Sequence, residues 1–243
     1  MTGPWGVLDG PAGSLRVCSS PERELPEAPF LLLCHELPRA RSSAGDLGRA
    51  YPALVDRLAQ ESGWQVAVGM LRGAGGSEGE FSADGWVEDV HFLLGALARG
   101  RRGWIAGFDL GGCIALRVAA EDPEVRGVAT VGAPDEPAAD PRVLLERSRA
   151  SGVIRRRGTP EDVGAWVGAV ESLDPVGAAA SLGDRPLLVV HGAEDRIVRP
   201  EAARALHAAA SHAELRIVPS AGHWLRADPR VVATLVGWLE RRR

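Results

Sequence analysis

Residues 103–112 read Gly-Trp-Ile-Ala-Gly-Phe-Asp-Leu-Gly-Gly, and their pattern predicts three consecutive elements. The first six residues are an apolar run of the length of a buried β-strand. Asp109 then stands between Gly107 and Gly111, in a Gly-x-Asp-x-Gly pattern that is typical of a tight turn. Apolar residues at helical spacing over residues 112–121 predict a helix directly afterwards. We therefore predict a strand, a sharp turn at Asp109 and a helix.

Apolar runs of the same kind recur along the chain and alternate with helix-like segments. Most of the runs are uninterrupted by polar residues, which is typical of parallel strands buried on both faces. Two short segments around a Gly-Pro-Ala-Gly turn, residues 6–9 and 14–18, predict an antiparallel hairpin. The order predicts a doubly wound α/β sheet with antiparallel strands at its N-terminal edge. The predicted strands are residues 30–35, 64–71, 103–108, 126–131, 186–191 and 214–219, and the predicted helices are residues 47–62, 84–99, 112–121, 199–211 and 228–242.

One stretch interrupts this alternation. Residues 133–183 contain two helix-like pieces, residues 141–151 and 160–172, and no strand-like run. The stretch is too short to form a domain of its own. We expect a single domain over residues 1–243, with residues 133–183 forming a small helical cap over one end of the sheet.

The composition excludes several classes of protein. The chain has 243 residues, 45% of them hydrophobic, and a formal net charge of −4. We therefore expect a globular protein without a basic field for nucleic acid or an anionic membrane. The chain has no Lys and no Asn, which excludes a Schiff-base lysine, a Walker-A lysine and a Cys-His-Asn triad. No apolar run approaches the length of a membrane span, and the first residues do not resemble a signal peptide.

The cysteines and histidines give no sign of a metal site. The three cysteines, Cys18, Cys34 and Cys113, are an odd number without a CxxC pair. A disulfide framework or a zinc site is therefore not expected, and a reducing, cytoplasmic location fits best. The run Gly73-Ala74-Gly75 is a poor match to a dinucleotide-binding fingerprint, because Glu78 holds the third glycine position. We expect neither a metal nor a cofactor.

Polar residues follow the predicted strands at the points where these strands end. His35 and Glu36 follow the first strand, and Asp109 follows the third. Asp195 and His223 follow the last two strands. Since ligands bind at the carboxyl ends of the strands in an open parallel sheet, we expect these side chains to meet at one edge.

These motifs resemble the α/β-hydrolase superfamily over nearly the whole chain. The order of nucleophile turn, acid and histidine is the same as in that superfamily, with Asp195 as the acid and His223 as the histidine. His35 resembles the family's His-Gly oxyanion loop, and residues 72–77 resemble the Arg-Gly-x-Gly-x-Ser turn of small serine esterases and peptidases of this fold. The resemblance implies an α/β-hydrolase fold and a catalytic triad.

Asp109 departs from the serine-hydrolase pattern, because it stands where the nucleophilic Ser is expected. A carboxylate that attacked an ester would form an anhydride, which is a poor intermediate. Against a saturated (sp3) carbon it would form an alkyl-enzyme ester, which His223 could hydrolyse by activating water. The resemblance to haloalkane dehalogenases and epoxide hydrolases of this superfamily implies that chemistry. Asp109 could also orient water, cap the helix or be a relic of a lost Ser.

The residues that those two branches use for the leaving group are not at the corresponding positions. Dehalogenases of the fold usually place Trp after the nucleophile to hold the halide, and here that residue is Leu110. Epoxide hydrolases of the fold use cap tyrosines, whereas the single tyrosine, Tyr51, lies far from the cap in sequence. Trp166 in the cap could supply an N–H donor to a substrate, but packing is the favoured interpretation of a tryptophan there.

The oxyanion loop carries the second departure, because Glu36 replaces the usual Gly. The backbone N–H groups of Leu37 and Leu110 are the candidate oxyanion donors. A carboxylate at Glu36 would oppose negative charge there unless it points away. We expect His35 to organise the loop through backbone hydrogen bonds. His223, placed between Asp109 and Asp195, is predicted to have a raised pKa.

Two functions remain open from the sequence. The first is a hydrolase of a small organic substrate, either an ester or amide or a substrate attacked at a saturated carbon by Asp109. The second is a catalytically degenerate member that keeps the pocket as a small-molecule binding or interaction module. An exposed apolar face of the cap could support a homodimer. The sequence does not identify the substrate.

Overall fold

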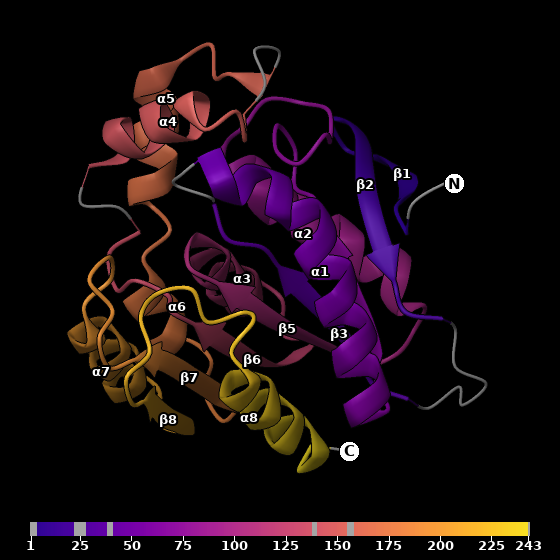
Figure 1. The fold of residues 1–243 in the computed structure, drawn as a ribbon, viewed down its shortest axis with the longest axis vertical. Helices are drawn as coiled ribbons and strands as arrows, with labels where there is room; N and C mark the ends of the chain where they lie inside the picture. The colour runs from indigo at the N-terminus through magenta and orange to yellow at the C-terminus, as the bar shows by residue number, and fades with distance from the viewer. Residues whose placement is uncertain (1–3, 22–27, 38–40, 138–139, 155–157, 243) are drawn as a thin grey trace.

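The computed structural model describes residues 4–21, 28–37, 41–137, 140–154 and 158–242 (Figure 1). In this part of the chain one eight-stranded sheet has the order β1-β2-β4-β3-β5-β6-β7-β8. The strands are β1 Gly6–Gly10, β2 Gly13–Ser19, β3 Phe30–Cys34, β4 Gln65–Gly69, β5 Gly103–Phe108, β6 Val125–Val131, β7 Leu187–Gly192 and β8 Ala213–Val218. Each predicted strand is present, and its bounds differ from the prediction by at most two residues.

The direction of the strands follows the predicted pattern. β1 pairs with β2 and β2 pairs with β4 in antiparallel fashion, whereas the pairs from β4 through β8 are parallel. All residues of β3, β4 and β7 are buried, as expected for parallel strands covered on both faces. The α/β-hydrolase fold class predicted from the sequence is confirmed.

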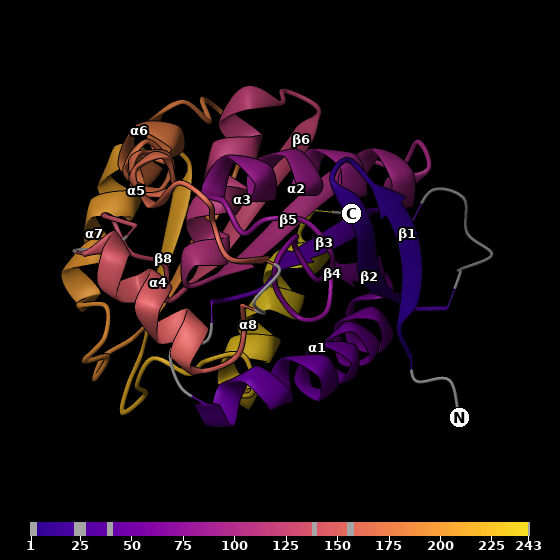
Figure 2. The same cartoon turned by 90° about the horizontal axis from the view of Figure 1, so that it is seen from above.

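Helices cover both faces of the sheet. α1 (Arg41–Ser62) and α8 (Pro229–Glu240) lie on one face, and α2 (Ala83–Ala98), α3 (Leu110–Glu121) and α6 (Pro175–Ala180) lie on the other (Figure 2). α7 (Pro200–Ala209) packs against β7, β8 and α6. Each face has its own apolar core, and Trp64, Trp104 and Trp238 pack edge to face in the core beneath α1 and α8.

The segment after β6 forms the helices α4 (Pro141–Ala150) and α5 (Val163–Glu171), which lie together at the top of Figure 1. α5 also contacts α2. The two predicted helices are therefore present; each ends one residue earlier than predicted, and α5 also begins three residues later. The prediction missed α6, because its six residues, Pro-Val-Gly-Ala-Ala-Ala, are too few to show a helical period.

Three helices begin with the dipeptide Asp-Pro. Asp140, Asp174 and Asp228 are the N-caps of α4, α6 and α8, and each carboxylate accepts a hydrogen bond from an N–H of the first turn. Proline follows at the first helical position, where no N–H is needed. None of the helices in the described residues is long and apolar enough to cross a membrane.

Candidate active site

Asp109 occupies the sharp turn between β5 and α3. Its backbone has φ 49° and ψ −123°, a conformation that residues other than glycine rarely adopt. The Asp109 N–H donates to the carbonyl of Val131 at 3.0 Å, and the Asp109 carbonyl accepts from the Gly112 N–H at 2.9 Å. Surrounding structure therefore holds a strained residue in place, which is typical of functional sites. The carboxylate lies at the carboxyl end of β5 and is 3% exposed.

The glycines around Asp109 are required by close approach of the backbone. A Cβ atom on Gly107 would lie 2.2 Å from the carbonyl oxygen of Gly111. A Cβ atom on Gly111 would lie 2.5 Å from the carbonyl oxygens of Cys34 and His35. The Gly-x-Asp-x-Gly spacing therefore lets α3 begin directly against the ends of β3 and β5.

Asp195 and His223 come from the loops that follow β7 and β8. The Nδ1 atom of His223 lies 2.8 Å from the Oδ2 atom of Asp195. The other carboxylate oxygen of Asp195 accepts from the N–H groups of Ile197 at 2.8 Å and Val198 at 3.0 Å. A second histidine, His191, places its Nε2 atom 3.2 Å from Asp195 Oδ2. Asp195 is thus fixed from several sides and orients His223.

The other ring nitrogen of His223 faces Asp109. The distance from His223 Nε2 to Asp109 Oδ1 is 3.5 Å. The structure therefore brings together the three residues that the sequence proposed as catalytic, from the ends of three strands. The imidazole stands between two carboxylates that are 86 residues apart in the sequence, from residue 109 to residue 195.

This arrangement shifts the pKa values of both His223 and Asp195. Burial alone would lower the pKa of His223, but hydrogen bonds and charge from Asp109 and Asp195 outweigh it and raise the pKa to about 9. Burial would likewise raise the pKa of Asp195, yet hydrogen bonds from His191, His223 and the Val198 N–H hold it well below its usual range. His223 is therefore an imidazolium at neutral pH, as the sequence predicted.

The raised pKa of His223 makes the stability of the fold depend on pH. The pKa is about 9 in the folded chain and about 6.5 when unperturbed, so the added stability is complete below pH 6.5 and is lost as pH rises through 9. We expect the free energy of unfolding to fall by about 3 kcal/mol over this range. Urea unfolding at several pH values measures this fall in the free energy of unfolding.

His223→Gln is the control for this pH dependence. His35 does not contribute to the decline between pH 6.5 and 9. Burial lowers the pKa of His35 to about 4, so its effect on stability is confined to pH values below 6.5. The variant should lose the decline between pH 6.5 and 9. An equal decline in the wild type and the variant would show that other groups cause it.

The loop after β3 contains His35, Glu36 and Leu37. The His35 Nε2 atom accepts from the Leu71 N–H at 3.1 Å, so its proton lies on Nδ1, which donates to the Glu36 carbonyl at 2.9 Å. His35 therefore holds the backbone of this loop. Leu110 begins α3, where the N–H groups of the first turn lack acceptors within the helix. Leu37 and Leu110 remain the proposed oxyanion donors.

The carboxylate of Glu36 is bound by two residues that were not among the predicted site residues. The hydroxyl of Tyr51 donates to one oxygen of Glu36, and the guanidinium of Arg226 donates to the other. The Glu36 N–H in turn donates to the Tyr51 hydroxyl at 3.2 Å. We refer to Glu36, Tyr51 and Arg226 as the Glu36 cluster.

A specific signal for this cluster is hard to find in the sequence. Tyr51 follows the apolar spacing of its helix and is fully buried, so its pattern indicates a core residue. A buried tyrosine usually finds a partner for its hydroxyl, which is the one hint available. Arg226 stands three residues after His223 in no recognised motif.

Trp166 is not at the site. It is 2% exposed and packs against Phe81, with ring centroids 5.3 Å apart, in the apolar core between α5 and α2. The expectation that Trp166 binds substrate is therefore not supported, because packing of the cap on α2 turns its ring into the core. Trp166 instead agrees with the alternative, in which it packs in the core.

The turn at residues 72–77 has a structural role. The Arg72 guanidinium lies 2.6 Å from the buried carboxylate of Asp89 and 2.7 Å from Glu88. The Arg72 N–H donates to the other oxygen of Asp89 at 2.7 Å. The ion pair fixes this turn to α2, close to the Leu71 N–H that binds His35.

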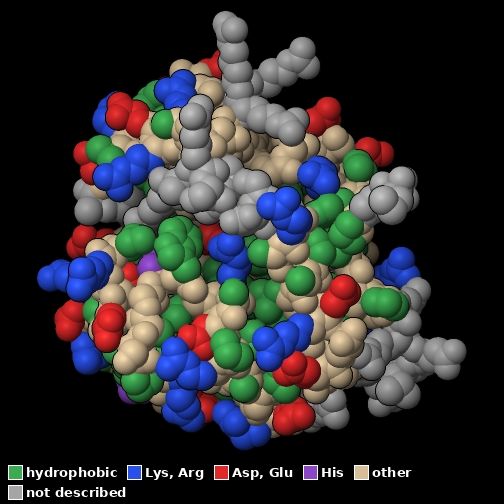
Figure 3. Space-filling model, viewed as in Figure 1, with side chains coloured by type: hydrophobic (Ala, Val, Ile, Leu, Met, Phe, Trp, Pro, Cys, Tyr) green, Lys and Arg blue, Asp and Glu red, His purple; other side chains and the backbone are tan. Residues whose placement is uncertain are grey.

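A small pocket of about 10 Å³ lies beside Asp109, which is room for about one water molecule. Four ionisable side chains line it, Asp109, His223, Glu36 and Arg226, together with apolar residues that include Trp224. Trp224 is 46% exposed, and hydrophobic side chains gather on this face between the cap and the segment that precedes α8 (Figure 3).

Among the described residues, no group of His, Cys, Asp and Glu side chains could hold a metal ion.

Comparison with known proteins agrees with this fold. Residues 29–178 match the family described as the alpha/beta hydrolase fold. Because the match covers more than half of the chain, the protein belongs to the α/β-hydrolase fold family. A search of curated proteins found no match.

Solved structures share the fold over almost the whole chain. A hydrolase from Pseudomonas aeruginosa has a TM-score of 0.70 and 20% identity, covering 98% of this chain and 99% of that one. An esterase from Thermogutta terrifontis has a TM-score of 0.69 and 19% identity, covering 98% of each chain. An enol-lactonase from Burkholderia xenovorans has a TM-score of 0.71 and 18% identity, covering 96% and 99%. At this identity the likeness shows the fold alone.

Proposed function

We propose that this protein is a hydrolase that attacks a saturated carbon of a small organic substrate with the carboxylate of Asp109. One observation carries the proposal. Asp109 is held in the strained turn with its Oδ1 atom 3.5 Å from His223, and His223 lies 2.8 Å from Asp195. Structural neighbours named as a hydrolase, an esterase and an enol-lactonase support a small-molecule substrate.

The first step needs no base. An oxygen of Asp109 forms a bond to the substrate carbon, and the bond from that carbon to the leaving group breaks with its electron pair. The product is a neutral alkyl ester of Asp109 and a leaving anion. A carboxylate attacks without a proton transfer, so this step leaves the proton of His223 in place.

The loss of charge on Asp109 then changes the role of His223. The charge and hydrogen bond of Asp109 are two of the causes that raise the pKa of His223. Once Asp109 is esterified, the pKa of His223 falls and the ring releases its proton to solvent. The neutral imidazole, still oriented by Asp195, can now act as a general base.

The second step is hydrolysis of the ester. His223 takes a proton from water, and the hydroxide adds to the ester carbonyl of Asp109. The Leu37 and Leu110 N–H groups would stabilise the oxyanion. When the carbon–oxygen bond to the alkoxide breaks, His223 protonates the alkoxide, and the new carboxyl group of Asp109 returns a proton to His223. The net reaction consumes one water and yields an alcohol, the leaving anion and one proton.

Heavy-oxygen labelling tests the role of Asp109. The protein is first screened with 1-bromobutane, 1,2-epoxybutane and p-nitrophenyl acetate. If 1-bromobutane or 1,2-epoxybutane turns over, a single turnover of that compound in heavy-oxygen water should place the label in the Asp109 carboxylate and not in the alcohol. A label found directly in the alcohol would mean that Asp109 only orients water, and the proposal would fail.

A non-catalytic protein that acts as an interaction module is the second candidate. The observation in its favour is the pocket volume of about 10 Å³, since the described residues leave little room for a substrate beside Asp109. This candidate predicts no turnover of any of the three compounds. If Asp109→Ser then hydrolysed p-nitrophenyl acetate, the protein would instead be a serine hydrolase that has lost its nucleophile.

A further inference from the structure

The Glu36 cluster brings a cation to the nucleophile. Arg226 and Asp109 line the same pocket, yet the mechanism above gives Arg226 no role. Its side chain is 15% exposed and that of Glu36 is 4% exposed, so this ion pair is largely removed from water. A partly desolvated guanidinium acts on nearby charge more strongly than a surface arginine does.

The cluster also fixes the position of this guanidinium. Arg226 donates to one oxygen of Glu36, while Tyr51 donates to the other and receives the Glu36 N–H. Burial raises the pKa of Tyr51 well above its ordinary value, so its hydroxyl stays protonated. Only one nitrogen of Arg226, Nη1, is used by Glu36, and a guanidinium carries five N–H donors. The cluster can therefore hold Arg226 while other donors face a ligand.

The charges around the pocket change when Asp109 is esterified. In the resting protein Asp109 and Glu36 are negative, and His223 and Arg226 are positive, so the lining has no net charge. Asp195 does not line the pocket and is hydrogen-bonded to His223. Conversion of Asp109 to a neutral ester leaves the lining with a net charge of +1 until His223 releases its proton. An anion produced at that moment restores neutrality.

We propose that Arg226 is a further catalytic residue, which binds the anion that leaves when Asp109 attacks, with Glu36 and Tyr51 as its positioning residues. The inference rests on the proposed function, and it identifies the substrate class. The substrate carries a leaving group that departs as a monovalent anion, because esterification of Asp109 leaves one net positive charge on the lining of the pocket. Arg226 donates hydrogen bonds to the departing anion but transfers no proton.

Binding of chloride without turnover tests this role. Asp109→Asn imitates the neutral ester, because Asn has nearly the shape of Asp without its charge. The measurement is chlorine NMR line width during titration with sodium chloride at about pH 6, which is below the pKa of about 6.5 of an unperturbed imidazole. We expect Asp109→Asn to bind chloride at least about tenfold more tightly than the wild type, because one negative charge has been removed.

A charge-matched variant distinguishes the effect of the Arg226 guanidinium on chloride binding from the effect of the net charge of the lining. Asp109→Asn combined with Glu36→Gln and Arg226→Gln keeps the lining at +1 and leaves no buried carboxylate without its partner. It should lose the gain in chloride affinity. Equal chloride affinity in this triple variant and in Asp109→Asn would overturn the proposal, and so would equal affinity in Asp109→Asn and the wild type.

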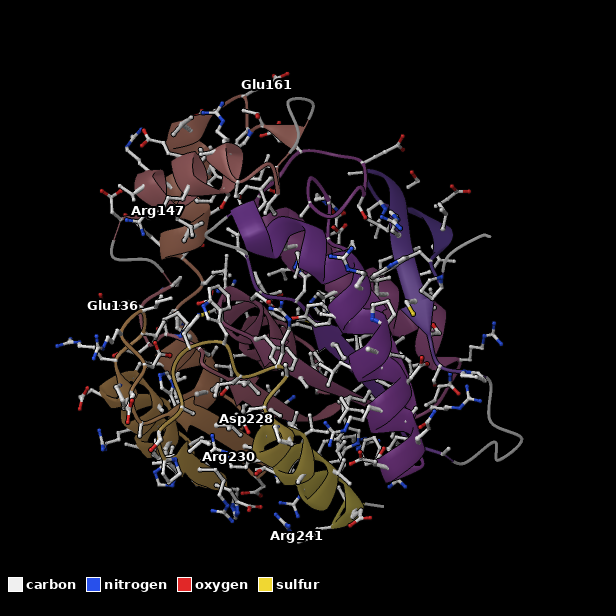
Figure 4. All side chains as sticks on the ribbon, in the orientation of Figure 1. Glu136, Arg147, Glu161, Asp228, Arg230 and Arg241 are labelled. Carbon is white, nitrogen blue, oxygen red and sulfur yellow. The ribbon has the colours of Figure 1, made fainter. Side chains whose placement is uncertain are left out.

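Arg230 provides a matched control on the same segment. It also forms an ion pair with a carboxylate, that of Asp228 at 2.6 Å, but its side chain is 52% exposed at the start of α8 (Figure 4). Asp109→Asn with Arg230→Gln should bind chloride as Asp109→Asn does, and a loss there would contradict the assignment to Arg226. Because no turnover is involved, failure here is distinct from failure of the labelling experiment.

Discussion

His223→Gln is expected to stop turnover and to leave a covalent alkyl ester on Asp109. Attack by Asp109 needs no base, whereas hydrolysis of the ester needs His223 to take a proton from water. Gln cannot accept that proton, so the first step proceeds and the second does not. We expect the steady-state rate to fall by roughly a thousandfold or more. Intact mass spectrometry after incubation with 1-bromobutane or 1,2-epoxybutane measures the added mass, and peptide mapping locates it.

The control for this trap is the double variant Asp109→Asn with His223→Gln. An amide is a poor nucleophile, so this protein should gain no mass from the same electrophiles. An adduct that persists in the double variant would mean that another side chain reacts. If the wild type turned over an electrophile that left His223→Gln unlabelled, an alkyl-enzyme mechanism would be excluded.

Gly111→Ala is expected to destabilise the fold by at least about 3 kcal/mol. The added Cβ atom would lie 2.5 Å from two carbonyl oxygens, those of Cys34 and His35. These are backbone atoms at the end of β3, so relief requires α3 to move away from the sheet. The movement would also displace Asp109. Chemical unfolding followed by circular dichroism measures the loss of stability.

Gly95→Ala is the matched substitution for comparison. Gly95 also lies inside a helix, α2, but a Cβ atom there would have no neighbour within 4 Å. Alanine is favoured over glycine in helices by about 1 kcal/mol, so this variant should be as stable as the wild type or slightly more stable. Equal effects of the two substitutions would mean that helix propensity, and not the close approach at the turn, governs the response.

Much of the fold could be predicted from local patterns. Buried parallel strands read as continuous apolar runs, and the predicted strand bounds agree closely with the observed ones. Helix ends were less accurate, as shown by α1, which begins at Arg41 and not at residue 47. Residues 41–46 include Arg, two Ser, Gly and Asp, so they show no apolar period. Helix ends depend on capping and packing more than on periodicity.

The positions of Asp109, Asp195 and His223 were predictable for a topological reason. Each follows a strand, and the carboxyl ends of parallel strands meet at one edge whatever the packing details. The Glu36 cluster has no such rule. Tyr51 reaches Glu36 from the middle of α1, and Arg226 reaches it from a loop 190 residues later in the chain. These contacts depend on how α1 and the loop before α8 pack against the oxyanion loop.

The sequence by itself determined which strands the polar site residues follow and that the fold is of the α/β class, because these follow from the spacing of the apolar runs. The sharp turn at Asp109 was implied by the resemblance to the α/β-hydrolase superfamily. Only the tertiary structure decided that Glu36 is held by Tyr51 and Arg226, that Trp166 is a packing residue, and that the pocket is small. The reason is physical. Periodicity reports which face of an element is buried, but partners of a buried charge are chosen by the three-dimensional packing of elements that are distant in sequence.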